Sequence, residues 1–279
     1  MHRTALMMWS VWLQSCAEHA MRGASMNSDP TVDVLFFNGW SLRGDFVEDF
    51  VRGIANGQSY RVVDVDERFL DSSWMQSLAS LVHPNTVLAG WSLGGMLAIR
   101  FARYLQDSEV PYQRLISLMA APEFVSSCSW PNAMPCEVFS EFEENAREDL
   151  LLTKAFPYLM AAGSSAGELG VNRKLLASVK ERYASALQGA ALRGQTLSLL
   201  KQLNVFDELK GLVRPVCMLF GAHDQLVPLA SALAVQKSFP QHDVRVVDGE
   251  THYLSDAFLQ LVRSLIDEGI PFERGIANV

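Results

Sequence analysis

The chain has 279 residues, of which 49% are hydrophobic and 19% are charged, and its formal net charge is −8. This length permits a substantial buried core, and the composition is that of a folded globular protein rather than a disordered one. The negative charge gives no electrostatic reason to expect binding to nucleic acid or to an anionic membrane surface.

Residues 1–30 are interpreted as an N-terminal extension, with disorder as one reading of it. An apolar run at residues 5–13 resembles a signal peptide, but Ser10 interrupts it and it is too short to span a bilayer. An amphipathic extension or a start at Met26 is favoured, with secretion as the alternative. The four cysteines form no C-x-x-C pair and no metal-ligand spacing, which favours reduced, buried thiols and a cytoplasmic protein.

Strand and helix patterns alternate over the first part of the chain. The apolar run 34–37 predicts a strand, and apolar residues at helical spacing from Phe46 to Ile54 predict a helix that Gly57 ends. The next expected elements are a strand at 61–65, a helix at 74–82, and strands at 86–89 and 115–119. Such alternation predicts a mostly parallel, doubly wound α/β sheet with right-handed crossovers.

The alternation stops between residues 122 and 205, where Ala, Leu and Glu are prominent and strand patterns are absent. It then resumes with a strand at 216–220, a helix from 229, a strand at 244–247 and a helix at 258–266. We therefore expect an α/β core built from residues 31–121 and 206–279. A helical lid formed by residues 122–205 would be inserted after the strand at 115–119.

The segment 90–94 has the pattern G-x-S-x-G, with Ser92 at its centre. An apolar strand precedes it and a helical pattern follows it, so the serine is placed on a tight strand-to-helix turn. Glycines on both sides leave room for a strained turn that lifts the hydroxyl clear of the sheet. An ordinary strand-to-helix connection is the simpler alternative.

A serine hydroxyl needs a general base, and the base needs a group that orients it. Of the six histidines, His252 alone follows the last strand in a loop, and Asp224 directly follows the strand at 216–220. Both are therefore expected at the carboxyl ends of the strands, beside Ser92. The order serine, acid, histidine predicts a catalytic triad, and Asp207 and Asp248 are the rival acids.

Two backbone N–H groups are expected to bind the oxyanion. Leu93 follows the nucleophile, and Trp40 lies in the turn after the first core strand. The Trp40 ring is expected either to wall the substrate pocket or to pack in the core. This chemistry requires no metal and no organic cofactor.

Several further segments join the motif around Ser92 in a recognisable set: Asn38-Gly39-Trp40, residues 90–95, Trp130-Pro131, Leu199-Leu200-Lys201 with Asp207, Gly221 with residues 224–228, and His252. On these residues the chain resembles the α/β-hydrolase superfamily over residues 32–268, and within it the pimeloyl-[acyl-carrier protein] methyl ester esterases of biotin synthesis. Two departures are Asn38, where many members have histidine, and the sequence around His252.

The resemblance implies hydrolysis of the methyl ester of a pimeloyl group attached to an acidic acyl carrier protein. It also implies that the lid covers the acyl chain and that basic lid residues hold the carrier. Residues 137–149 carry a net charge of −5 and residues 173–193 a net charge of +4, so the second segment is the expected docking region. The expected docking residues are Arg173, Lys174, Lys180 and Arg182, although a solvated helix surface explains them equally well.

The substrate-binding residues are expected to be Trp40, Leu93, His252 and an apolar group in the lid, namely Phe156, Tyr158, Leu159 and Met160. Packing of the lid on the core would explain the apolar group equally well. The leading hypothesis is a monomeric serine carboxylesterase of this kind. The alternatives are a broader carboxylesterase or thioesterase, and a hydrolase-fold protein that binds a ligand without turnover.

Overall fold

The computed structural model describes residues 31–146, 149–163 and 170–268. The expected N-terminal extension, residues 1–30, lies outside this range, as do residues 269–279 of the expected core. Six strands form one parallel sheet in the order β2-β1-β3-β4-β5-β6, so the predicted parallel α/β sheet is confirmed. Their bounds are β1 Val34–Phe37, β2 Tyr60–Val63, β3 Val87–Trp91, β4 Arg114–Leu118, β5 Val216–Gly221 and β6 Asp243–Val247.

The four central strands are buried along their whole length, whereas the edge strands β2 and β6 are partly exposed. This is the pattern of a parallel sheet that helices cover on both faces. The chain order reverses between β1 and β3, which are hydrogen-bonded neighbours. Loops that follow these two strands leave the sheet in opposite directions, and ligands of open α/β sheets bind at such a point.

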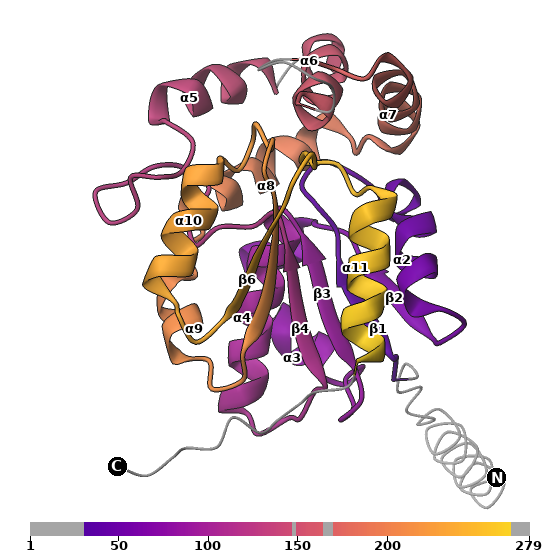
Figure 1. Cartoon of the computed structure of the whole chain (residues 1–279), viewed down its shortest axis with the longest axis vertical. Coiled ribbons are helices and arrows are strands. Elements are labelled where there is room, and N and C mark those ends of the chain that lie inside the picture. Colours follow the sequence, from indigo (N-terminus) through magenta and orange to yellow (C-terminus); the bar gives the residue numbers. More distant parts are fainter. Residues whose placement is uncertain (1–30, 147–148, 164–169, 269–279) are drawn as a thin grey trace, which may run out of the picture. The chain divides into compact units, whose positions relative to one another are not determined.

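Helices cover both faces of the sheet (Figure 1). Helices α2 (Glu48–Ala55) and α11 (Asp256–Asp267) lie side by side on one face. Each of them buries a single stripe at helical spacing, for example Phe258, Val262 and Leu265 in α11. The other face carries α3 Trp74–Ala79, α4 Leu93–Asp107, α9 Phe206–Gly211 and α10 Leu229–Ser238.

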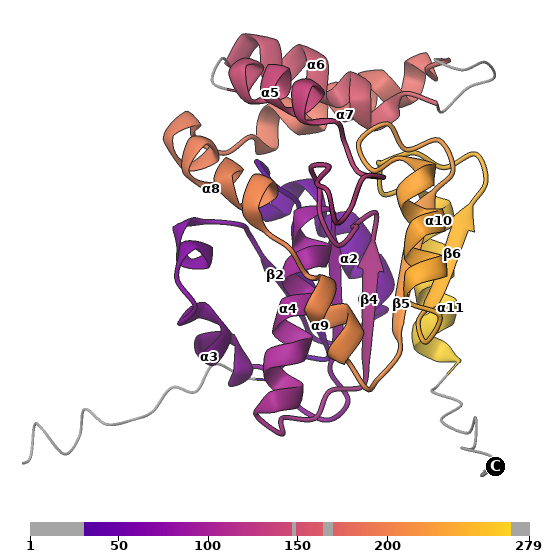
Figure 2. The same ribbon diagram turned by 90° about the vertical axis from the view of Figure 1, so that its left-hand side faces the viewer.

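Residues 122–205, which we call the helical insertion, leave the core after β4 and return to it before α9. Its helices are α5 Cys136–Asn145, α6 Asp149–Ala161, α7 Arg173–Ala186 and α8 Ala190–Gln202. Helices α5, α6 and α7 lie beyond one end of the sheet, and α8 leads back toward α9 (Figure 2). The two ends of the insertion are tied together, because Val205 N–H donates to Pro122 O (2.9 Å) and Asn204 Nδ2 donates to Glu123 Oε1 (2.5 Å).

Three local expectations need correction. The helix expected from Phe46 to Ile54 is divided into a short 3-10 helix, η1 (Gly44–Phe46), and α2. A second 3-10 helix, η2 (Glu67–Leu70), begins at the side-chain cap that Asp66 provides and was not predicted. Cys128, in a loop, and Cys136, the first residue of α5, are exposed rather than buried, whereas Cys217 in β5 is buried. Cys16 lies outside the described residues.

Candidate active site

Ser92 stands on a strained turn between β3 and α4. Its backbone has φ 56° and ψ −125°, a conformation that a residue with a side chain adopts only when its surroundings enforce it. The Ser92 N–H donates to Leu118 O of β4 (2.8 Å), and the Ser92 carbonyl accepts the N–H of Gly95 (2.9 Å) in the first turn of α4. The strand before and the helix after therefore hold the turn in this conformation.

The two glycines of the motif are required by close backbone packing. A Cβ atom on Gly94 would lie 2.1 Å from the carbonyl oxygen of Phe37, at the end of β1. A Cβ atom on Gly90 would lie 2.3 Å from the carbonyl oxygen of Gly94. Both obstacles are backbone atoms, which cannot rotate away as a side chain can. The spacing of the motif is thus set by the approach of α4 to the sheet.

Gly94→Ala is expected to lower the free energy of unfolding by about 3 kcal/mol or more, because the new methyl group overlaps the backbone of β1. Denaturant unfolding followed by circular dichroism measures this change. Gly194→Ala is the matched control. Gly194 lies inside α8 with open space around it, so alanine is expected to stabilise the protein by up to about 1 kcal/mol. Similar midpoints for Gly94→Ala and the parent protein would contradict the packing argument.

His252 and Asp224 form a buried pair at the ends of β6 and β5. The His252 Nδ1 atom lies 2.7 Å from Asp224 Oδ2, and both side chains are 1% exposed. The other carboxylate oxygen, Oδ1, accepts the N–H groups of Leu226 (2.8 Å) and Val227 (2.9 Å). Because a carboxylate only accepts, Nδ1 carries the proton in the neutral ring and Nε2 is left as an acceptor.

The Nε2 atom of His252 is buried and has no hydrogen-bond partner among the described residues. Ser92 and His252 line the same cavity, although no hydrogen bond joins them within the described ranges. Catalytic hydrogen bonds are often long without substrate and tighten when it binds. The buried acceptor of an imidazole that Asp224 orients therefore lies at the cavity that Ser92 also lines.

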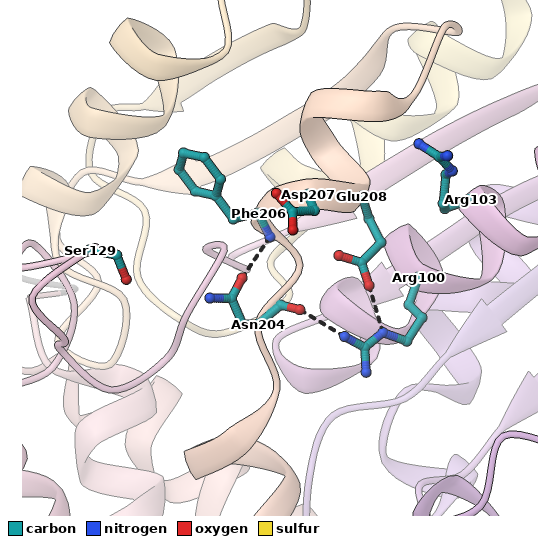
Figure 3. A pocket seen from close by; sticks show the side chains of 7 residues that line it. All are labelled: Arg100, Arg103, Ser129, Asn204, Phe206, Asp207 and Glu208. Atoms are coloured by element: carbon teal, nitrogen blue, oxygen red, sulfur yellow. Dashed lines mark hydrogen bonds and ion pairs between the residues drawn. The ribbon is translucent and has the colours of Figure 1, made fainter.

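The rival acids lie elsewhere. Asp207 is exposed in the first turn of α9, at a cleft of about 610 Å³ that α9 forms with α4 (Figure 3). In that cleft Arg100 already pairs with Glu208 (2.8 Å) and with the carbonyl oxygen of Asn204 (2.7 Å). Asp248 is exposed after β6. Asp224 is the acid that contacts His252.

The other described histidines have other partners. His83 lies 3.4 Å from Asp33, and His223 Nδ1 lies 2.8 Å from the carbonyl oxygen of Gly163, at the end of α6. His242 contacts the carbonyl oxygen of Leu209 (2.9 Å), and burial lowers the pKa of its imidazole. Among the described histidines, His252 is the one that contacts Asp224.

Asn38 shapes the turn that carries Trp40. Its Oδ1 atom accepts the N–H of Gly39 (2.8 Å), while Nδ2 donates to Leu42 O (3.0 Å) and to Asp64 Oδ1 (3.1 Å). Within the described ranges, the backbone N–H groups of Trp40 and Leu93 are not taken by any protein acceptor. Two free donors that follow β1 and β3 are therefore available to an oxyanion at the point where the strand order reverses.

Burial raises the pKa of Asp64 above its ordinary value, although the hydrogen bond from Asn38 works in the opposite direction. When folding raises the pKa of a carboxyl group, the folded protein becomes more stable as pH falls through that pKa and less stable as pH rises through it. Asp64→Asn is therefore expected to stabilise the protein at neutral pH, by less than about 1 kcal/mol, since the amide oxygen still accepts. The gain should shrink below pH 5. Equal melting temperatures of the two proteins at neutral pH would contradict this.

The cavity between Ser92 and the helical insertion is narrow and lined mainly by aromatic side chains. Its volume is about 10 Å³, enough for one water molecule at most. Trp40, Phe142 and Phe156 pack together over it, with ring centroids 5.5 to 5.9 Å apart. An acyl chain can enter only when these rings move. The lining consists of Gly39, Trp40, Trp91, Ser92, Phe124, Phe142, Phe156, Leu200, Leu226 and His252.

The predicted substrate-binding set is only partly found at this cavity. Trp40, Phe156 and His252 line it, and Leu93 is buried beside it at the start of α4. Tyr158 is 41% exposed on α6, Met160 is buried in the core, and Leu159 is partly buried and packs against the core. Phe124, Phe142, Leu200 and Leu226 were missed. Helical spacing gives the apolar face of α5 and α8, but it does not say which residues of that face meet Ser92.

The expected docking residues divide into two groups. Arg173, Lys174 and Lys180 are exposed on α7, as a docking surface requires. Arg182 is half-buried and donates to Tyr253 Oη (2.7 Å) and Phe46 O (2.5 Å), so it is turned toward the core instead. The expectation that Arg182 meets a carrier is therefore corrected.

In the part of the chain that the structure describes, no cluster of His, Cys, Asp and Glu has the arrangement needed to hold a metal ion. None of its helices is long and apolar enough to cross a membrane.

The chain is similar in sequence to known proteins. The model of the family described as "Alpha/beta hydrolase family" matches residues 29–262. A pimeloyl-[acyl-carrier protein] methyl ester esterase of Xanthomonas campestris pv. campestris (strain B100) is 29% identical over 231 residues, which cover 78% of this chain and 87% of the relative. A protein of the same name from Vibrio vulnificus is 27% identical over 229 residues, covering 79% and 87%.

Solved structures give the same fold. The esterase EaEST from Exiguobacterium antarcticum superposes with a TM-score of 0.63 and 19% identity, covering 84% of this chain and 90% of that one. At this identity the likeness concerns the fold. The resemblance to the α/β-hydrolase superfamily and to these esterases is confirmed, and so is the expected enzyme class, a carboxylic ester hydrolase.

Proposed function

The chain belongs to the alpha/beta hydrolase family, and we propose that it is a serine carboxylesterase that hydrolyses the methyl ester of a pimeloyl group carried by an acyl carrier protein. The catalytic part of this proposal is supported by the buried His252–Asp224 pair. The Nε2 atom of His252 has no hydrogen-bond partner among the described residues, and His252 lines the same cavity as Ser92. The substrate is proposed from the names of the relatives, because both relatives described above are pimeloyl-[acyl-carrier protein] methyl ester esterases.

The proposed reaction has two stages. His252 accepts the hydroxyl proton as Ser92 Oγ attacks the ester carbonyl, and the N–H groups of Trp40 and Leu93 stabilise the oxyanion. The imidazolium then protonates the leaving methoxide, and methanol departs from the acyl-serine. Water, deprotonated by His252, attacks the acyl-serine in the second stage and releases the carboxylic acid.

The lining of the cavity supports an uncharged acyl chain near the ester. Apart from His252, the described side chains that line the cavity around Ser92 are aromatic or aliphatic, and none of them is an acidic or basic group that would pair with a free carboxylate. A pimeloyl chain esterified at one end and bound to a carrier at the other presents only methylene groups to this region.

The exposed cations of α7 support an acidic partner. Arg173, Lys174 and Lys180 project from one helix of the insertion, whereas Glu137, Glu141 and Glu144 make the exposed surface of α5 acidic. A carrier that docks by charge would therefore approach α7. In this proposal Arg182 takes no part in docking.

The decisive assay uses the methyl ester of pimeloyl-carrier protein and separates its products. We expect methanol release with the carrier thioester intact, and no methanol from Ser92→Ala. Release of the carrier thiol would instead indicate a thioesterase. A kcat/KM for p-nitrophenyl butyrate well above that for the carrier-bound ester would indicate a broader carboxylesterase, and wild-type protein without any turnover would indicate a binding protein.

Charge reversal at Arg173, Lys174 and Lys180 tests the docking surface separately. It is expected to raise KM for the carrier-bound ester and to leave p-nitrophenyl butyrate hydrolysis unaffected. Rescue of a biotin-requiring strain that lacks its own esterase, by the wild type but not by Ser92→Ala, tests the biological role.

A further inference from the structure

Arg182 links the helical insertion to the segment that carries His252. It lies in α7 and is half-buried. One guanidinium nitrogen donates to Tyr253 Oη (2.7 Å), the residue next to His252, and the other donates to the carbonyl oxygen of Phe46 in η1 (2.5 Å). The guanidinium carbon also lies 5.4 Å from the centroid of the Phe46 ring, within the range of a cation–π contact.

The Phe46 contact continues to the catalytic residues through Trp91. The rings of Phe46 and Trp91 are stacked, with centroids 5.8 Å apart and an interplanar angle of 12°. Trp91 directly precedes Ser92, and its Nε1 donates to the carbonyl oxygen of His252 (2.9 Å). The contacts of Arg182 thus reach His252 by two routes, through the adjacent Tyr253 and through the Phe46–Trp91 stack.

The end of α7 is itself fixed to the core. The N–H of Arg43 donates to Ala186 O (2.8 Å), and the N–H of Gln188 donates to Ser41 O (2.9 Å). These bonds tie the last turn of α7 to the loop after Trp40. Arg182 extends from this anchored end toward the loop of His252, which follows β6 at another place on the rim of the sheet.

We propose that Arg182 is a positioning residue, which holds Tyr253 and the Phe46–Trp91 stack so that His252 Nε2 stays aligned with Ser92. The proposal rests on the proposed function, because alignment matters only if His252 serves as the base. A guanidinium suits this role, since its planar fork bonds two acceptors at fixed angles while its face contacts an aromatic ring. A lysine ammonium is a single point charge and cannot reproduce that geometry.

The test compares Arg182→Met, Arg182→Lys, Tyr253→Phe and the double variant Arg182→Met/Tyr253→Phe on p-nitrophenyl butyrate. We expect Arg182→Met to lower kcat about 30-fold with KM within about threefold, because a misplaced base costs rate rather than binding. Tyr253→Phe keeps the ring and loses one bond, so a fall of about fivefold is expected. Arg182→Lys should be intermediate.

The double variant shows whether the two residues act together. If the Arg182–Tyr253 bond helps to align His252, the kcat of the double variant should be no more than about twofold below that of Arg182→Met. The fall in kcat would then be smaller than the product of the two single effects. Lys210→Met, a change at an exposed cation of α9, is the control and should leave kcat unchanged. If the Arg182 variants do not fold, Tyr253→Phe alone tests the proposal. An unchanged kcat of Tyr253→Phe would then overturn it.

A second readout separates this proposal from the proposed function. Diethyl p-nitrophenyl phosphate phosphorylates a base-activated serine and releases one p-nitrophenolate, so the burst rate reports alignment without ester turnover. Wild-type protein that gives the burst but hydrolyses no ester would overturn the function and leave Arg182 to be judged by the burst rates. Variants with lower melting temperatures but unchanged kcat and burst, or with raised KM at unchanged kcat, would overturn the role of Arg182. Wild-type protein that gives neither reaction would overturn both.

Discussion

Ser92→Ala is expected to lower kcat for ester hydrolysis by about 10⁶-fold, because no other described residue that lines the cavity carries a hydroxyl that could form the acyl intermediate. Alanine tolerates φ 56° no better and no worse than serine does, so the turn and the fold should persist. Since the aromatic lining is untouched, binding of a substrate analogue should change by less than about threefold. Steady-state kinetics with p-nitrophenyl butyrate and a thermal melt measure both properties.

Ser117→Ala provides the control for this experiment. Ser117 lies in β4 with a buried hydroxyl that has no hydrogen-bond partner among the described residues, so its loss should cost neither activity nor stability. A Ser92→Ala enzyme that keeps more than a tenth of the wild-type rate would show that another group is the nucleophile. A lost burst with diethyl p-nitrophenyl phosphate would independently place the reactive oxygen at Ser92.

The fold and the three catalytic candidates could be predicted because they depend on local patterns and on chain order. Buried parallel strands are continuous apolar runs, so β1, β3, β4 and β5 were located to within two or three residues. Once the sheet is parallel, every loop after a strand lies on the same rim. Asp224 and His252 could therefore be selected from many acids and six histidines by position alone.

The contacts around these residues could not be predicted, because they depend on how helices far apart in sequence pack. Phe142 lines the cavity because α5 lies over Trp40, and no periodicity in α5 specifies that neighbour. Arg182 has the composition of a surface cation, yet the turn of α7 on which it lies faces Phe46 and Tyr253. The bond between Asn38 and Asp64 likewise joins residues from the ends of two strands. In each case the sequence identifies the residues but does not show that they contact each other.

Asp224→Asn is expected to lower kcat by about 10⁴-fold while the protein remains folded. The amide oxygen should take the place of Oδ1, because the N–H groups of Leu226 and Val227 both point at that position and need an acceptor. The amide nitrogen then faces His252 Nδ1, 2.7 Å away in the parent structure. Two donors cannot bond each other, so the imidazole proton moves to Nε2.

With its proton on Nε2, His252 can no longer accept the proton of Ser92, although every heavy atom keeps its place. The variant should therefore lose kcat without a comparable loss in melting temperature, whereas Asp224→Ala should lose both, since it leaves three buried donors without an acceptor. Asp207→Asn, at the exposed rival acid of α9, should retain the wild-type rate. If Asp207→Asn were the inactive variant and Asp224→Asn the active one, the buried pair would be a structural contact rather than part of a proton relay.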